Sequence, residues 1–157
     1  MENTYITSAL NQMEIALKTI IEIIETLEEA DLQKMPASNK RSIGELFEHI
    51  AVICKADLLI ANSATQKEMS EYYSSVSLKS VNAIKDAIAY NYETLKESYS
   101  NLTETELQER TTSYWGVTYT RYEWLLEIVA HIYHHRAQLH TLLVFCYGKD
   151  LNISLFE

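Results

Sequence analysis

Five histidines occur in this 157-residue chain, and two of them have the spacing of a metal-binding pair. His131 and His135 are four residues apart, so an α-helix would place them on one face with their β-carbons about 6 Å apart. Two imidazoles at that separation can bind one divalent ion, because zinc–nitrogen bonds are about 2.0–2.1 Å long. The pair therefore predicts a metal site on a helix.

A third ligand must come from another part of the chain. On a helical wheel, His135 falls inside the apolar stripe of its segment and His131 at its rim, whereas His134 and His140 fall outside. His49 lies at the rim of the stripe of a second predicted helix. We therefore expect these three side chains to converge in a cleft at the edge of a bundle: His49, His131 and His135. The alternative is that they are ordinary polar residues at a helix seam.

The residues around the pair limit the chemistry of such a site. Ile132 follows His131, so the Glu base of an HExxH metalloprotease is missing from its usual place. Imidazole ligands suit Zn²⁺ or Ni²⁺. No fourth protein ligand is evident, which predicts an open position where a thiol or water would bind and lose its proton more easily.

Asp57 and Arg136 are the charged residues whose predicted places need explaining. Asp57 falls in the apolar stripe two turns after His49, where a buried carboxylate needs a partner. It is expected to make a structural hydrogen bond, with an acid–base role or the orientation of a side chain on the last helix as alternatives. Arg136 faces away from the histidine pair and is expected to pair with an acidic residue on a neighbouring helix or subunit.

Aromatic residues and cysteines are further candidates. Tyr133 is expected at an interface or exposed to solvent. Residues 111–119 show no helix period and predict an extended loop packed over the bundle, or else the wall of a substrate pocket, through Tyr114, Trp115 and Tyr119. No CxxC motif occurs, and the two cysteines are expected to be inert, reduced thiols: Cys54 and Cys146.

Apolar residues at steps of three and four predict four long helices. Capping boxes at Ser42, Thr103 and Thr120 mark helix starts, and Gly148 marks a stop. A short helix is expected at about 103–110, a loop with a possible helical turn at 66–77, and a tail from Asp150. The sequence therefore predicts one all-α domain over residues 1–157, an up-and-down type four-helix bundle with long helices at about Thr4–Ala30, Ser42–Ala64, Leu78–Leu102 and Thr120–Tyr147.

Composition supports this fold and argues against two classes of partner. Only 3 glycines and 1 proline occur, too few for the many turns of a β-sandwich or barrel. A net charge of −9 disfavours binding to nucleic acid or to an anionic membrane surface. The N-terminus lacks the features of a signal peptide, and no apolar run reaches the roughly 20 residues of a membrane span. A soluble, cytoplasmic protein is expected.

Two segments carry a family resemblance. The run His-Ile-Tyr-His-His-Arg-Ala-Gln from His131, preceded by Glu-Trp-Leu-Leu-Glu-Ile-Val, resembles the HxxHHRGQ helix of the DinB-like superfamily. The capped segment from Ser42 to His49 resembles that family's EL-x-x-H pattern, and the likeness extends over the whole chain in helix order. The resemblance implies a four-helix bundle, often a homodimer, with metal ligands at His49, His131 and His135. Ala137 departs from the family's usual glycine.

The resemblance implies several functions rather than one. Some branches look like bacillithiol S-transferases or mycothiol-dependent isomerases, others like metal-dependent hydrolases, and some members lack the metal. The first hypothesis is an enzyme that uses a divalent ion, Zn²⁺ or Ni²⁺, to transfer a low-molecular-weight thiol to an electrophile. The runner-up is a metal-dependent hydrolase, and a non-catalytic, dimeric, stress-associated binding protein is the second hypothesis.

Overall fold

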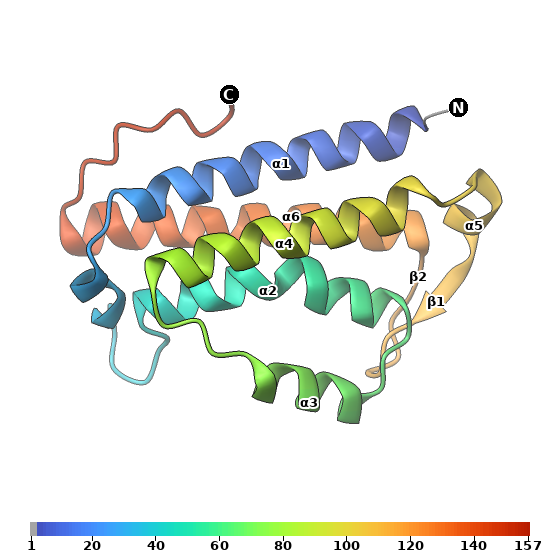
Figure 1. The fold of residues 1–157 in the computed structure, drawn as a ribbon, viewed down its shortest axis with the longest axis horizontal. Coiled ribbons are helices and arrows are strands. Elements are labelled where there is room, and N and C mark those ends of the chain that lie inside the picture. The colour runs from blue at the N-terminus through green and yellow to red at the C-terminus, as the bar shows by residue number, and fades with distance from the viewer. Residues whose placement is uncertain (1–2) are drawn as a thin grey trace.

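A computed structural model describes residues 3–157, so residues 1–2, which the predicted domain includes, lie outside it. Four long helices pack into a bundle, which confirms the all-α fold (Figure 1): α1 (Thr4–Glu25), α2 (Ile43–Ala61), α4 (Val81–Ser100) and α6 (Arg121–Thr141). The α1 helix contacts α4 and α6, and α2 contacts the same two helices. No helix within the described part of the chain is both long and apolar enough to cross a membrane.

The chain does not reverse direction at every step of the bundle. Helices α2 and α4 run the same way, because the segment between them crosses back along the outside of the bundle (Figure 1). That crossover contains α3 (Gln66–Ser75), where a loop was expected. A capping box between Thr65 and Glu68 starts the helix, and Met69 buries its one apolar face against the bundle. The prediction of a loop with a possible helical turn was therefore wrong. Because the other faces of this helix are polar and exposed, the segment lacks the apolar periodicity by which a helix is recognised.

Capping residues set the starts of the other helices. The predicted capping boxes are all present: Ser42 with Glu45, Thr103 with Glu106 and Thr120 with Glu123. Helix α1 ends at Glu25 rather than near Ala30. A separate 3₁₀ turn, η1 (Glu29–Gln33), follows it, because the Asp31 carboxylate accepts a hydrogen bond from the Glu28 backbone N–H and starts a new helical turn.

The segments on either side of α6 differ from the predictions. After the short helix α5 (Glu104–Gln108), residues 110–120 form a hairpin in which β1 (Arg110–Thr112) pairs antiparallel with β2 (Thr118–Thr120). Extended backbone was predicted there, but strand pairing was not. At its other end α6 widens into a π-helical turn, η2 (Leu142–Cys146), before Gly148, whose φ of 61° ends the helix as expected.

Helix α2 lies close against the η1 turn, and this contact requires a glycine. A β-carbon at Gly44 would come within 2.8 Å of the Leu32 carbonyl oxygen, which is backbone and cannot move aside. The first turn of α2, and therefore the position of the helix that carries His49, depends on this small residue.

Arg136 holds the C-terminal tail to the bundle. Its buried guanidinium donates to the hydroxyl of Thr19, at 2.9 Å, and to the carbonyl of Leu155. The rings of Tyr133 and Phe156 flank it, with centroids 4.6 and 4.8 Å from the guanidinium carbon. The prediction that Arg136 pairs with an acidic residue on a neighbouring helix is therefore wrong, because its acceptors are a hydroxyl and a backbone carbonyl. Burial lowers the pKa of Arg136, since desolvation disfavours its charge.

We expect Thr19→Val to reduce the free energy of unfolding by about 1–3 kcal/mol, because it leaves one N–H of a buried cation without an acceptor. The measurement is urea unfolding followed by circular dichroism. Thr94→Val is the matched control. The hydroxyl of each threonine donates to the backbone carbonyl one helical turn earlier, but Thr94 lies on an exposed surface. Equal losses in both variants would contradict this role for Thr19.

Candidate metal centre

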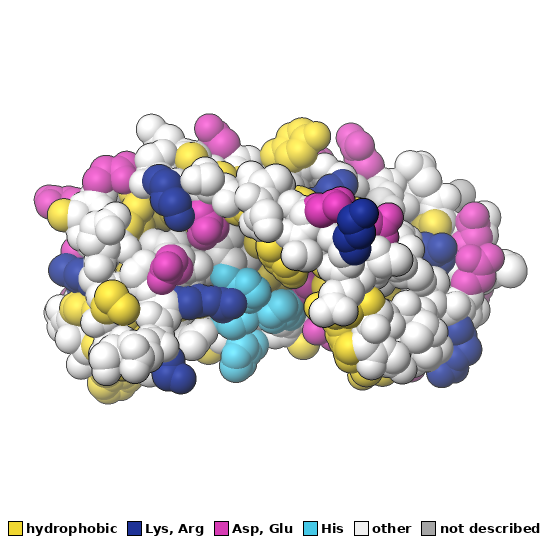
Figure 2. Space-filling view, turned by 90° about the horizontal axis from the view of Figure 1, so that it is seen from below, with side chains coloured by type: hydrophobic (Ala, Val, Ile, Leu, Met, Phe, Trp, Pro, Cys, Tyr) yellow, Lys and Arg dark blue, Asp and Glu magenta, His cyan; other side chains and the backbone are white. Residues whose placement is uncertain are grey.

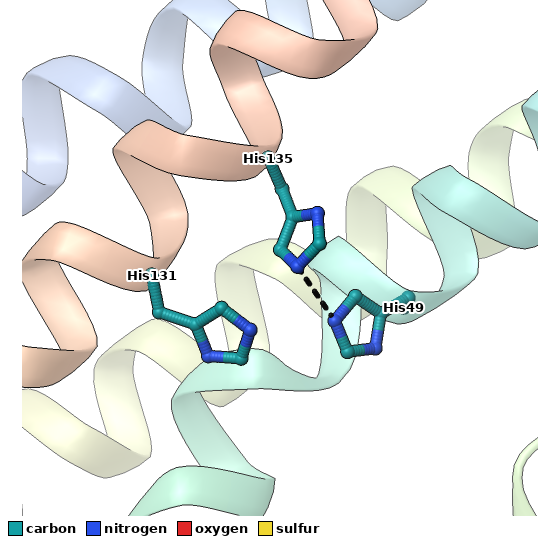
Figure 3. Close-up of side chains that lie close together, drawn as sticks. All are labelled: His49, His131 and His135. Carbon is teal, nitrogen blue, oxygen red and sulfur yellow. Dashed lines mark hydrogen bonds between the residues drawn. The ribbon is translucent and has the colours of Figure 1, made fainter.

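Three histidines from two helices meet where α2 packs against α6 (Figure 3). His49 projects from α2, and His131 and His135 project from successive turns of α6. One nitrogen from each ring lies within 4.8 Å of the other two, and the Nε2 atoms of His49 and His135 are 3.1 Å apart. Two nitrogens that share a tetrahedral zinc ion are about 3.4 Å apart, so the observed spacing is close to that of a metal site.

All three histidines lie at the rim of the core, as the helical wheel predicted for His49 and His131, whereas His135 was expected inside the apolar stripe. Each is half-buried, and the residues beside them on the two helices, Ile50 and Ile132, are fully buried. In the space-filling view the histidines line a hollow in the surface, with Lys and Arg side chains directly beside them (Figure 2). The site therefore has an apolar floor and an opening to solvent.

Asp57 fixes the orientation of His131. Its carboxylate oxygen lies 2.6 Å from His131 Nδ1, and the residue is 7% exposed. Because Nδ1 faces this acceptor, Nε2 is the ring nitrogen left to bind an ion. Of the roles considered for Asp57, the structure shows a hydrogen bond that orients a side chain on the last helix.

Gln138 fixes the orientation of His135, a role that the sequence analysis did not assign to it. Its Oε1 lies 2.9 Å from His135 Nδ1, one turn further along α6. The spacing of three residues on one helix is the signal that could have revealed it. Both α6 histidines are thus held through Nδ1, a common arrangement for metal-binding imidazoles.

The contact between His49 and His135 depends on which nitrogens carry protons. With the His135 proton on Nδ1, toward Gln138, its Nε2 is an acceptor, and His49 Nε2–H is the donor of the 3.1 Å hydrogen bond. Binding of an ion by both Nε2 atoms would require the His49 proton to move to Nδ1 or to be lost. Protons and metal therefore compete at this contact.

Burial and neighbouring charges separate the three histidines electrostatically. Burial, aided by Arg41 and the other two histidines, lowers the pKa of His49 to about 3. The pKa of His135 is also lowered, mainly by burial. The hydrogen bond to Asp57 raises the pKa of His131 instead. His49 and His135 are therefore kept neutral, which is the form that binds metal.

A second group of possible ligands shares His131. Asp57, Glu127 and His131 offer atoms within 4.8 Å of one another. Burial, followed by repulsion from Asp57, raises the pKa of Glu127. Glu127 lies one turn before His131, a spacing of four residues that could have marked it. The Asp57 oxygen already bonds His131, so we take this group to support the three histidines rather than to replace them.

Two cavities flank the histidines. One, of about 440 Å³, is lined in part by His49, Arg41 and Tyr73. The other, of about 610 Å³, is lined in part by His135 and Cys146. Both are within the size range of small-molecule sites.

The remaining candidates lie outside the group of three rings, although the ring of His134 packs edge-on against His135, with centroids 4.8 Å apart. The hairpin aromatics do not line either cavity within the described residues, and Trp115 and Tyr119 pack edge-on against Trp124. These contacts support the expectation that the aromatic residues pack over the bundle rather than the alternative that they form the wall of a substrate pocket. His134 is exposed, and the hydroxyl of Tyr133 donates to the Gln12 carbonyl.

The two cysteines differ. Cys54 is buried, and burial raises its pKa well above the usual range, which agrees with an inert thiol. Cys146, by contrast, is exposed on the π-helical turn at the wall of the larger cavity. The wider turn rotates it away from the stripe that a regular α-helix would give.

The low pKa of His49 predicts an acid-sensitive contribution to stability. Unfolded histidine titrates near 6.5 and His49 near 3, so below about pH 6.5 the unfolded state binds more protons and stability falls. Between pH 7 and 5, metal-free His49→Gln should lose less unfolding free energy than the parent, by about 1 kcal/mol after allowance for partial exposure. Urea unfolding at both pH values measures this. A parent and variant that lose the same amount would show that His49 is not held neutral by the fold.

Comparison with known proteins places the chain in a family. The DinB superfamily matches residues 12–139. A protein described as a DinB family member from Exiguobacterium sibiricum 255-15 is 30% identical, with a TM-score of 0.88 over 99% of this chain and 100% of the other. Among curated proteins, none matches.

Two further solved structures share the fold. A DinB-like protein from Bacillus cereus ATCC 10987 is 19% identical, with a TM-score of 0.72 over 96% of this chain and 95% of that one. A DinB-like protein from Bacillus subtilis is 17% identical, with a TM-score of 0.68 over 99% and 98%. Since the family match covers most of its length, the chain belongs to the DinB superfamily.

Proposed function

We propose that His49, His131 and His135 bind one divalent metal ion through their Nε2 atoms. The observation that carries this proposal is the convergence of three ring nitrogens within 4.8 Å, two of them on rings held by second hydrogen bonds. An ordinary polar seam would not need Asp57 and Gln138 to turn both α6 rings toward His49. Imidazole ligands favour Zn²⁺ or Ni²⁺.

The proposed site is catalytic rather than structural. Structural zinc sites are closed by four protein ligands, whereas the described residues bring three histidines together beside two cavities. When bound, the ion would supply a positive charge that lowers the pKa of a thiol or a water molecule in the cavity. The chain itself would contribute the fixed rings, the apolar floor and the space for a substrate.

The reaction we propose is transfer of a low-molecular-weight thiol to an electrophile. The thiolate sulfur forms a bond to an electrophilic carbon, the leaving group departs with the electron pair of the broken bond, and the thiol proton passes to solvent. The support is the family membership and the cavities on both sides of the histidines, which give room for two small molecules. A homodimer, a cytoplasmic location and a single domain over residues 1–157 stay predictions.

The parent protein, loaded with Zn²⁺ or Ni²⁺ and desalted, should retain about one equivalent of metal by mass spectrometry. His135→Ala should retain less than about a tenth of that amount, because it loses one of three ligands. His134→Ala is the matched control, since this exposed neighbour lies outside the cluster and should leave the metal content unchanged. Equal metal in the parent and His135→Ala would rule out this site.

Turnover tests the reaction separately from metal binding. The loaded parent should couple bacillithiol or cysteine to 1-chloro-2,4-dinitrobenzene at least about tenfold faster than His135→Ala, as measured by absorbance of the thioether. Chloride is the leaving group in this assay. Equal rates in the two proteins would contradict thiol transfer. Metal-dependent hydrolysis of 4-nitrophenyl acetate without thiol transfer would support the hydrolase alternative instead.

A further inference from the structure

The larger cavity beside His135 carries only positive formal charge. Its walls come from the segment before α2 and from the end of α6, and the charged side chains besides histidine that line it are Lys40 and Arg41. Among residues 3–157 no acidic side chain lines it, although the protein has a net charge of −9. A positive cavity on an acidic protein is a local feature that overall composition does not explain.

Both cations are free to bind a ligand. Within residues 3–157, neither Lys40 nor Arg41 forms an ion pair with an acidic side chain. Lys40 and Arg41 also line the smaller cavity, and the two carboxylates that line it with them are already engaged with other groups. Glu45 accepts from the Ser42 backbone N–H, and Glu48 accepts from the Leu78 N–H and pairs with Lys79.

The rest of the larger cavity is mainly apolar. Pro36, Leu46 and Leu142 contribute to its lining, and the cavity is about 610 Å³. His135, one of the proposed metal ligands, also lines the cavity, together with its hydrogen-bond partner Gln138. A molecule with an apolar body could therefore fill the cavity, place one end at His135 and place a charged group beside Arg41.

We propose that the larger cavity binds the apolar body of an amphiphilic carboxylic acid, whose carboxylate lies against Arg41 and Lys40. The planar guanidinium of Arg41 matches the geometry of a carboxylate. A small inorganic anion would leave the apolar lining of the cavity without contacts, so a ligand with an apolar body fits better. The proposal rests on the proposed function in one respect: it gives the substrate class of the same site, with the reacting group near His135. Arg41 is then a specificity-determining residue.

The test compares two probes that differ in one group, 4-phenylbutyrate and 4-phenylbutanol, by calorimetry at about pH 8, above the unperturbed histidine pKa of about 6.5. Full-length protein is first stripped of metal and desalted, so that a metal ion cannot attract the carboxylate. The parent should bind the acid at least about tenfold more tightly than the alcohol. Arg41→Gln should abolish that preference and leave the affinity for the alcohol unchanged.

Lys67→Gln is the matched control, because Lys67 carries the same charge on the exposed surface of α3, outside the cavity. It should keep the preference for the acid. Equal affinities of the parent for acid and alcohol, no binding of either, or equal effects of Arg41→Gln and Lys67→Gln would each overturn the proposal. His49→Ala separates the two proposals: His49 is a proposed metal ligand that does not line the larger cavity, so this variant should lose metal but keep the preference for the acid in the metal-free state.

Discussion

The hydrogen bond between Asp57 and His131 joins the packing of the bundle to the geometry of the site. It links α2 to α6 through a buried carboxylate, at 2.6 Å, beside the apolar core of the bundle. Burial of that carboxylate is tolerable only because the histidine satisfies it. The same bond turns Nε2 of His131 toward His49. Helix packing and ligand orientation are therefore two consequences of one contact.

Other buried polar groups tie the remaining parts of the bundle together in the same way. Asn91 on α4 donates to the Ala51 carbonyl on α2, and Arg136 on α6 joins α1 to the C-terminal tail. Each of these groups has few ways to be satisfied, so each selects one arrangement of its helices. Apolar packing supplies most of the stability, while these polar contacts define which faces meet.

The electrostatics of the site differ from those of the molecule as a whole. The acidic side chains give the protein its negative charge, yet the region around the histidines is governed by Arg41 and Lys40 on one side and by Asp57 and Glu127 on the other. Arg41 and burial keep His49 neutral, whereas Asp57 favours the protonated form of His131. Because neutral and protonation-favouring histidines lie side by side near cationic side chains, a metal ion, an anionic ligand and a proton would compete within a small volume.

From the sequence alone, the four long helices, three capping boxes and the convergence of His49, His131 and His135 could be predicted, because helical periodicity and capping are local properties. The α3 helix, the hairpin pairing and the π-helical turn at Cys146 could not, because tertiary contacts decide them. The roles of Gln138 and Arg41 depend on side-chain direction and on the meeting of distant segments. Periodicity determines which face a residue occupies, but only the packed structure decides what lies opposite that face.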